Sequence, residues 1–375
     1  MNTKSTLFIR DLGDGLILRH GSPEDADALA DINSRMHSDN GPDQPEMGIA
    51  AWIQDLVAKP HPTLKPTDFT VVEETATGRI VSTLCLIPQT WTYAGIEFGV
   101  GRPELVCTLP DFRKRGLVRI QMEEVHKWSA ERGHLMEFIT GIPNFYRQFG
   151  YDMALSFVGR RTGYEGNVPK LKDGESEPVN IRPAREEDLD FVLEMYEQWE
   201  KRYLVSCKRS LDLVRYESFG KRDDNINRFE KMVIEDTSGK RIGFFEYPTS
   251  LWMDGLPCIY FALVEGVSFL KITPSVARYL WEKGAEYAAR DEKTRVTFSF
   301  LLGEDHPAYE AMDDRLPAKR PAYAFYIRVA DMPAFLKRIQ PVLEQRLAQS
   351  LAAGHSGELR LNFYTSGVRL VFEHG

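Results

Sequence analysis

The 375-residue sequence is poor in cysteine and has no long apolar run. No CxxC pair occurs among its four cysteines, Cys85, Cys107, Cys207 and Cys258, and the eight histidines show no HxxxH or HExxH spacing. These absences argue against a zinc centre and a disulfide framework, so we expect no metal. No segment approaches the roughly 18–20 apolar residues that cross a bilayer, and the first residues lack a signal-peptide pattern. We therefore expect a cytoplasmic protein that binds no membrane.

The sequence has fewer basic than acidic residues. Lys and Arg number 47 against 55 Asp and Glu, which gives a net charge of −8 and a pI near 5.6. Such a surface suits neither nucleic acids nor anionic membranes, but it is compatible with cationic ligands. The apolar fraction of 43% and the charged fraction of 27% are those of a globular chain and exclude wholesale disorder.

Two segments of the sequence begin in the same way. Residues 16–32 read LILRHGSPEDADALADI, and residues 179–195 read VNIRPAREEDLDFVLEM. An offset of 163 residues aligns four identical pairs: Arg19 with Arg182, Glu24 with Glu187, Asp25 with Asp188, and Asp27 with Asp190. Each copy predicts a short strand, a polar turn and a helix whose first turn is acidic, as the helix dipole favours. We infer an internal duplication.

Apolar periodicity predicts a mixed α/β fold with about three parts. Helices are expected within residues 25–62, a hairpin within 69–87, a strand at 105–109, a helix at 117–132, a strand at 135–140 and a helical turn at 144–149. From residue 323 the pattern changes to a helix from Asp331 and a hairpin that turns at TSG. We expect a first domain at 1–160, a linker at 161–178, a second domain at 179–322 and a C-terminal segment at 323–375.

Residues 106–128, VCTLPDFRKRGLVRIQMEEVHKW, carry the clearest chemical signal. A strand passes through a Pro-Asp turn directly into a helix. Backbone N–H groups at such a helix start, with a glycine for close approach, form a nest for anions. Arg113, Lys114, Arg115 and Arg119 would oppose the helix dipole unless an anion lies there. This favours a pyrophosphate site over a basic helix start that faces only solvent.

This segment resembles motif A of the GNAT acetyltransferases, whose pattern is Q/R-x-x-G-x-G/A. Arg113 and Gly116 match it, whereas Val118 stands where the family has Gly or Ala. GIPNFYRQFGYDMA, residues 141–154, resembles the N-x-Y-x-x-x-G-F/Y motif that follows in the same family. The RxRGLxR and FYxxFGY sequences are similar to those of the Eis (enhanced intracellular survival) type of acetyltransferase. This type joins two GNAT units to a sterol-carrier-like segment.

The resemblance implies two tandem GNAT-like mixed-sheet domains, a short α+β sterol-carrier-like C-terminal segment, and a homo-oligomer that is a hexamer. It also implies acetyl-CoA as co-substrate, with the pantetheine along the strand and the pyrophosphate at the helix start. The residues expected to bind acetyl-CoA are Val106, Cys107, Thr108, Lys114, Arg115, Gly116, Leu117, Val118 and Arg119. Tyr146 occupies the family's general-acid position. In the family a longer C-terminal segment brings its terminal carboxylate to the active site, and we do not transfer this role to Gly375.

Acetyl transfer from a thioester to an amine requires a deprotonated amine, a stabilised oxyanion and a proton for the departing thiolate. A tyrosine can supply that proton, because its pKa of about 10 lies near that of a thiol. For Tyr146 the alternative is a core role in the aromatic cluster with Phe145, Phe149 and Tyr151.

The base is left open between two carboxylates. Glu104, expected on the same strand face as Val106 and Thr108, or Glu97 could act through water, but the pattern favours a solvated edge residue for each of them. Cys107 has no histidine partner nearby in the sequence, so direct transfer is expected rather than a covalent intermediate.

The second unit lacks the nest. Residues 261–284 contain no RxxGxG, and Pro274 is expected at the helix start, so we expect a degenerate copy that serves structure and the walls of the acceptor site. His306 is expected to cap a turn or to lie on the surface.

These observations predict an N-acetyltransferase that acts on a primary amine of a small polycationic molecule or on a lysine side chain. The alternatives are a non-catalytic CoA- or lipid-binding regulatory protein and a GNAT enzyme that uses another acyl-CoA. Intact Arg113, Arg115, Gly116 and Tyr146 favour the enzyme.

Overall fold

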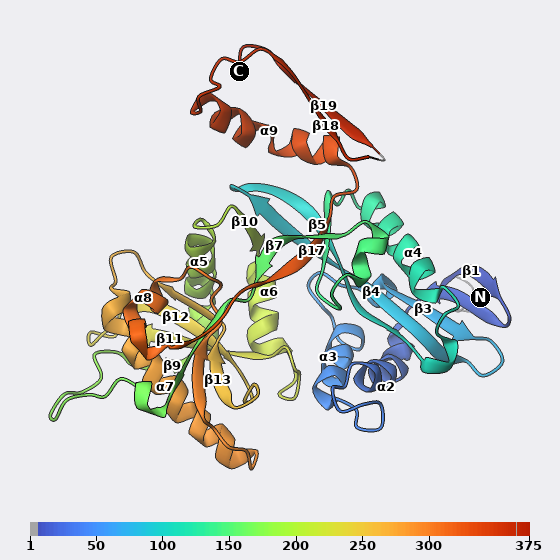
Figure 1. The fold of residues 1–375 in the computed structure, drawn as a ribbon. Coiled ribbons are helices and arrows are strands. Elements are labelled where there is room, and N and C mark those ends of the chain that lie inside the picture. The colour runs from blue at the N-terminus through green and yellow to red at the C-terminus, as the bar shows by residue number, and fades with distance from the viewer. Residues whose placement is uncertain (1–6, 365) are drawn as a thin grey trace.

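The computed structural model describes residues 7–364 and 366–375. It contains a large mixed sheet with helices on both faces, two smaller sheets, and a C-terminal segment (Figure 1). This confirms the expected α/β class. Within the described residues, no helix is both long and apolar enough to span a bilayer.

The first unit is built on the large sheet. Its elements are β1 (Phe8–Gly13), β2 (Leu16–His20), α2 (Ala26–Met36), α3 (Met47–Val57), β3 (Phe69–Glu74), β4 (Arg79–Tyr93), β5 (Ile96–Thr108), α4 (Leu117–Glu131), β6 (Met136–Ile139) and β7 (Asp152–Phe157). Helices α2 and α3 bury their apolar residues against one face of the sheet, and α4 covers the other face. Strands β4 and β5 are longer than predicted and carry the sheet across the molecule.

Two four-stranded sheets form most of the second unit, in the orders β14-β12-β11-β9 and β13-β15-β8-β16. The elements are β8 (Arg160–Tyr164), β9 (Asn180–Pro183), α5 (Leu189–Glu200), β10 (Val205–Lys208), α6 (Leu211–Arg215), β11 (Phe229–Glu235), β12 (Arg241–Pro248), β13 (Gly255–Cys258), β14 (Tyr260–Leu263), α7 (Phe269–Arg290), β15 (Thr297–Phe300), α8 (Pro307–Met312) and β16 (Ala318–Arg320). Pro274 lies inside α7 rather than at its start, because the helix begins five residues earlier.

The residues that align between the two copies make the same contacts in both. Arg19 forms two hydrogen bonds with Asp25, at 2.7 and 2.8 Å, and a third with Glu73 at 2.7 Å. In the second unit Arg182 contacts Asp188 at 2.6 and 3.0 Å and Glu235 at 2.8 Å; the three residues hold the same positions on strand, turn and strand. The internal similarity of the sequence therefore corresponds to a repeated structural device.

Strands are exchanged between the units. β8, which starts one residue before the expected linker, pairs with β15 and β16 of the second unit. β10 pairs with β4, and β17 (Tyr323–Arg328), expected to open the C-terminal segment, lies between β6 and β7 of the first sheet. The sequence does not reveal these pairings, because they satisfy backbone groups far apart in the chain.

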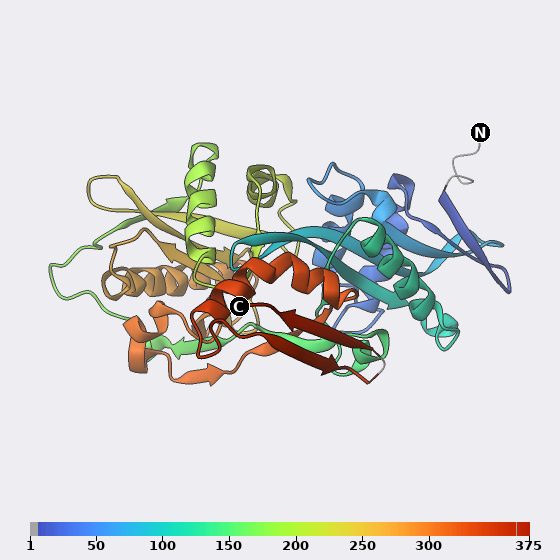
Figure 2. The same ribbon diagram turned by 90° about the horizontal axis from the view of Figure 1, so that it is seen from above.

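The C-terminal segment consists of α9 (Met332–Ala348) and a hairpin of β18 (Gly357–Asn362) and β19 (Gly367–Phe372). Of the predicted TSG turn, Thr365 lies outside the described residues. Phe335 of α9 packs edge-on against Phe98 of β5, with ring centroids 5.5 Å apart. Seen from above, this segment lies over the junction of the two units (Figure 2).

Candidate active site

A slot opens in the first sheet where β5 and β6 diverge. The two strands run parallel and pair only at Val100 with Met136 and at Gly101 with Glu137. Beyond this point a cavity of about 800 Å³ lies between β5, the start of α4 and the turn at Phe145–Phe149. Nine of the ten residues predicted for the site line it: Val106, Cys107, Thr108, Lys114, Gly116, Leu117, Val118, Arg119 and Tyr146. The tenth, Arg115, stacks over the Phe112 ring at 5.0 Å.

The start of α4 has the backbone of an anion nest. Gly116, at the N-cap, has φ +74°, and Lys114 has φ +62°. A Cβ built on Gly116 would meet no atom within 4 Å, so the space before the helix is open. Residues of alternating right- and left-handed conformation turn successive N–H groups toward one point, and a positive φ favours glycine.

The four cations around this helix start have no acidic partner. Among the described residues, no ion pair joins Arg113, Lys114, Arg115 or Arg119 to a carboxylate, and the first turn of α4 contains no acid. Arg113 donates to the Thr108 carbonyl at 3.3 Å, and Arg119 donates to the Gln148 amide oxygen at 2.9 Å. Uncompensated cations at the positive end of a helix dipole destabilise the fold unless an anion binds, so the site suits a pyrophosphate.

A β-bulge in β5 corrects the prediction for Glu104. Thr83 of β4 opposes Cys107, whereas Cys85 opposes Glu104, so two residues of β5 oppose one residue of β4. Leu105, in the bulge, has φ +57°. Glu104 therefore shares a face with Cys85, toward α2 and α3, while Val106 packs with the cluster under α4. The strict two-residue alternation that placed Glu104 beside Val106 fails because a bulge inserts one residue.

Tyr146 is both a core residue and part of the cavity wall. It lies in the 3₁₀ turn Phe145–Phe149, is 6% exposed, and packs within the cluster under α4. Its ring lies against Gly141, where an added Cβ would be only 2.6 Å from the ring. Its hydroxyl makes no hydrogen bond with any described residue, whereas the Tyr151 hydroxyl contacts His126 Nε2 at 2.8 Å. Burial, then Glu104 and Tyr326, raise the pKa of Tyr146, so the phenol keeps its proton at neutral pH.

The two carboxylates proposed as the base lie in different places. Glu104 lines the slot and accepts a hydrogen bond from Arg102 Nε at 2.8 Å. Glu97 is paired with Lys208 of the second unit and does not line the slot. A residue that sequence reasoning missed, His37 at the end of α2, also lines the slot. Burial lowers the pKa of His37, against the opposing effect of Glu104; a single histidine after a helix gives no sequence signal.

The Cys107 side chain points away from the slot. It is buried on the α2 face, with Sγ 3.6 Å from Asn33 Oδ1, and burial raises the pKa of its thiol. A thiol held in its protonated form is a poor nucleophile. Cys107 therefore meets the cavity through its backbone, which agrees with direct transfer.

The corresponding region of the second unit is filled by side chains. His306, 3% exposed, accepts a hydrogen bond from the Ala308 N–H at 3.1 Å and contacts the Phe261 carbonyl at 3.0 Å. Its ring packs against Trp199, Phe261 and Phe269. Burial lowers the pKa of His306 to about 4. Of the two roles expected for His306, capping a turn or lying on the surface, the structure shows a cap at the start of α8, and the side chain is buried.

In the part of the chain that the structure describes, no group of three or more His, Cys, Asp or Glu residues is placed to hold a metal ion.

Comparison with known proteins agrees with the fold and the slot. Residues 18–154 match the family model described as acetyltransferase (GNAT) domain. No curated protein sequence matches the chain. A probable N-acyltransferase from Enterococcus faecalis is 13% identical with a TM-score of 0.61, covering 86% of this chain and 75% of its own. A GCN5-related N-acetyltransferase from Anabaena variabilis is 12% identical, with a TM-score of 0.61 and coverage of 96% and 84%.

A third similar structure is the Saccharomyces cerevisiae N-myristoyltransferase with bound myristoyl-CoA. It is 14% identical with a TM-score of 0.58, covering 88% of this chain and 82% of its own. At these identities the likeness concerns the fold. The family match assigns residues 18–154 to the GNAT acetyltransferase domain, and the divergent strands and the basic helix start of this region agree with that assignment.

Proposed function

We propose that the protein transfers an acetyl group from acetyl-CoA directly to a primary amine, either of a small polycationic molecule or of a lysine side chain. One observation carries this proposal. A single cavity brings together three cations at the start of α4, the hydroxyl of Tyr146, which has no hydrogen-bond partner among the described residues, and the carboxylate of Glu104.

The binding of acetyl-CoA follows from the two walls of the slot. The backbone N–H groups that follow Gly116, with Lys114 and Arg119, would hold the pyrophosphate. The edge of β5 that β6 leaves unpaired, residues 106–108, would pair with the pantetheine amides as an added strand. The open space before Gly116 and the absence of competing carboxylates support this fit.

The transfer step uses groups on opposite faces of the sheet. Glu104, on the α2–α3 face, takes the proton of the ammonium, directly or through water. The amine then attacks the thioester carbonyl carbon, forming the C–N bond, and N–H groups of the bulged strand stabilise the oxyanion. As the C–S bond breaks, Tyr146, on the α4 side, gives its proton to the sulfur. The attacking nitrogen, positively charged after the C–N bond has formed, releases its second proton to water and becomes the amide nitrogen, and Tyr146 regains a proton from solvent. This arrangement separates the base from the acid, so the two do not neutralise each other.

The proposal also includes a family subtype, a cellular location and an oligomeric state. The motif spellings support the Eis-like type, with a cytoplasmic hexamer as its assembly. The presence of Tyr146, in addition to Arg113, Arg115 and Gly116, supports an enzyme over a regulatory protein that only holds CoA or a lipid.

A screen of amine acceptors, with detection of released CoA thiol, tests the function. We expect release that depends on both acetyl-CoA and an amine, with the acetylated amine as product. If the protein binds acetyl-CoA in calorimetry but acetylates no amine, the proposal is overturned, and the alternative of a non-catalytic regulatory protein is favoured.

A further inference from the structure

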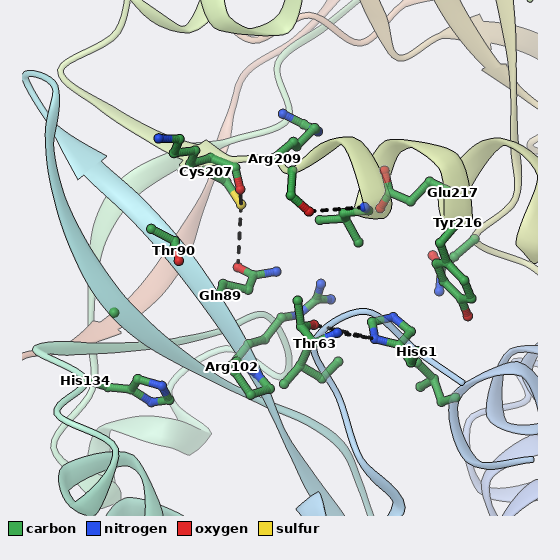
Figure 3. Close-up of a pocket in the computed structure, with 18 of the residues that line it drawn as sticks. His61, Thr63, Gln89, Thr90, Arg102, His134, Cys207, Arg209, Tyr216 and Glu217 are labelled. Carbon is green, nitrogen blue, oxygen red and sulfur yellow. Dashed lines mark hydrogen bonds between the residues drawn. The ribbon is translucent and has the colours of Figure 1, made fainter. Parts of the chain in front are cut away.

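A second cavity, of about 720 Å³, lies between the two units (Figure 3). The first unit contributes His61 and Thr63, from the loop before β3, and residues of β4 and β5. On the opposite side, β10, the loop between β10 and α6, and the turn after α6 contribute Cys207, Arg209, Tyr216 and Glu217. Because β10 pairs with β4, this wall is fixed to the sheet that carries the slot.

This cavity begins beside Glu104. Arg102 opposes Ile87 and Glu104 opposes Cys85, so both side chains lie on the α2–α3 face of β5, two residues apart. Two residues along a strand span roughly 6–7 Å. Arg102 lines the second cavity and also donates to Glu104 at 2.8 Å. The proposed base therefore stands at the border between the acetyl-CoA slot and the second cavity.

Most charged groups that line this cavity already have a partner. Arg132 contacts Asp68 at 2.5 Å, Arg209 contacts Glu200 at 2.6 Å, and Lys208 is paired with Glu97. These pairs leave little net charge on the wall. They also leave the cations compensated, so a purely anionic ligand would gain little there.

Glu217 is the exception. No described residue donates a hydrogen bond to it, and its closest cation is Lys221 at 3.9 Å, whose Nζ donates to the Asn227 carbonyl at 2.7 Å instead. Its side chain is 31% accessible, which it owes to the cavity it lines. Burial raises the pKa of Glu217, but Lys221, Lys231 and Arg209 outweigh this and keep it lower than usual. A carboxylate that lines a cavity and receives no hydrogen bond from a described residue is free to accept hydrogen bonds from a ligand in that cavity.

We propose that this cavity binds the amine acceptor and that Glu217 receives a second ammonium group of that acceptor, remote from the one that is acetylated. The inference rests on the proposed function and narrows its substrate class to diamines. An ammonium group offers three donors to a carboxylate. The Gln89 side-chain nitrogen and the Thr90 hydroxyl, which have no hydrogen-bond partner among the described residues, line the same space and can contact the chain of the acceptor (Figure 3).

The test compares cadaverine with pentylamine, which have the same carbon chain and differ by one amino group. A charge-assisted hydrogen bond corresponds to roughly a tenfold to hundredfold change in affinity. We expect wild type to prefer cadaverine in kcat/KM by about that factor. Glu217→Gln should raise KM for cadaverine by a similar factor, leave kcat for it within about threefold, and leave KM for pentylamine unchanged. Asp224→Asn, at an exposed ion pair with Arg222 outside the cavity, is the control.

The outcomes separate this inference from the proposed function. If wild type acetylates both amines equally, or if Glu217→Gln changes both alike, the assignment of Glu217 is wrong while the acetyltransferase activity stands. If wild type binds acetyl-CoA but acetylates no amine of any kind, the proposed function itself fails. The wild-type preference needs no variant, so a poorly folded Glu217→Gln does not remove the test.

Discussion

At the scale of single residues, the proposed site depends on the directions in which the side chains of Tyr146 and Glu104 point. Tyr146 has a packed ring and a hydroxyl without a hydrogen-bond partner in the described part of the chain, so it belongs to the core and also lines the cavity. Glu104 reaches the opposite face only because the bulge at Leu105 shifts the register of β5. The proposed proton donor and the proposed proton acceptor thereby lie on either side of one slot.

Tyr146→Phe removes the hydroxyl and keeps the packing of the ring. We expect kcat to fall by roughly 10²–10⁴-fold, the usual size of a general-acid contribution, with acetyl-CoA affinity and Tm little changed. The measurement is kcat at saturating acetyl-CoA. Tyr151→Phe is the control: it shares the cluster but loses a hydrogen bond to His126, so it should lower stability by about 1 kcal/mol without a comparable loss of kcat. Equal kcat in the two variants would return Tyr146 to a purely structural role.

Glu104→Gln distinguishes the two carboxylates that the sequence left open as the base. Glutamine keeps an oxygen that can accept from Arg102, so the fold should persist while proton uptake is lost. We expect kcat to fall by about 10²-fold or more and KM for acetyl-CoA to stay within a few-fold. Glu97→Gln, at an exposed pair with Lys208, should retain kcat. A larger loss of kcat in Glu97→Gln than in Glu104→Gln would reverse this assignment.

At the scale of elements, the backbone at the start of α4 has the conformation that the proposed anion site requires. The helix follows β5 through a turn with two left-handed residues and carries cations where acids would stabilise it. Such an arrangement lowers the free energy of unfolding of the protein without ligand, and binding of an anion raises it again.

Gly116→Asp should weaken acetyl-CoA binding by at least about tenfold, since it adds a side chain and a negative charge where the pyrophosphate is proposed to lie. Calorimetric titration with acetyl-CoA measures this. Gly78→Asp is a matched control, because Gly78 also has a positive φ, +71°, and no atom within 4 Å of an added Cβ, yet lies in the turn before β4. If the two variants bind acetyl-CoA equally well, the nest is not the binding site.

At the scale of the whole molecule, the second unit exchanges strands with the first. It lends β10 to the large sheet and receives β8, while β17 returns to the first unit. Its own equivalent of the slot is occupied by the His306 cluster. The Arg–Asp–Glu contacts are present at the start of both units, whereas the RxxGxG pattern is absent from residues 261–284 of the second unit.

The protein should therefore bind one acetyl-CoA per chain. Isothermal titration, with the protein concentration fixed by absorbance, gives the stoichiometry directly. Affinity should fall as salt is raised, because the cations at α4 account for much of the attraction. Two sites per chain, or one site that survives Gly116→Asp, would place binding in the second unit.

The sequence by itself determined the features that depend on short stretches of chain. The repeated strand-turn-acidic-helix pattern, the helix at residues 117–132, the basic nest and the general position of Tyr146 each follow from contiguous residues, because caps, periodicity and turn chemistry act over a few positions. Nine of the ten predicted site residues meet in one cavity for this reason.

Only the tertiary structure decided the rest. The bulge at Leu105 depends on how β5 pairs with β4, and that pairing moved Glu104 to the other face of the sheet. The insertion of β17 between β6 and β7, and the cavity in which Glu217 faces Arg102, join residues more than a hundred positions apart. Such contacts are fixed by the mutual satisfaction of distant backbone and side-chain groups, which leaves no local trace in the order of the amino acids.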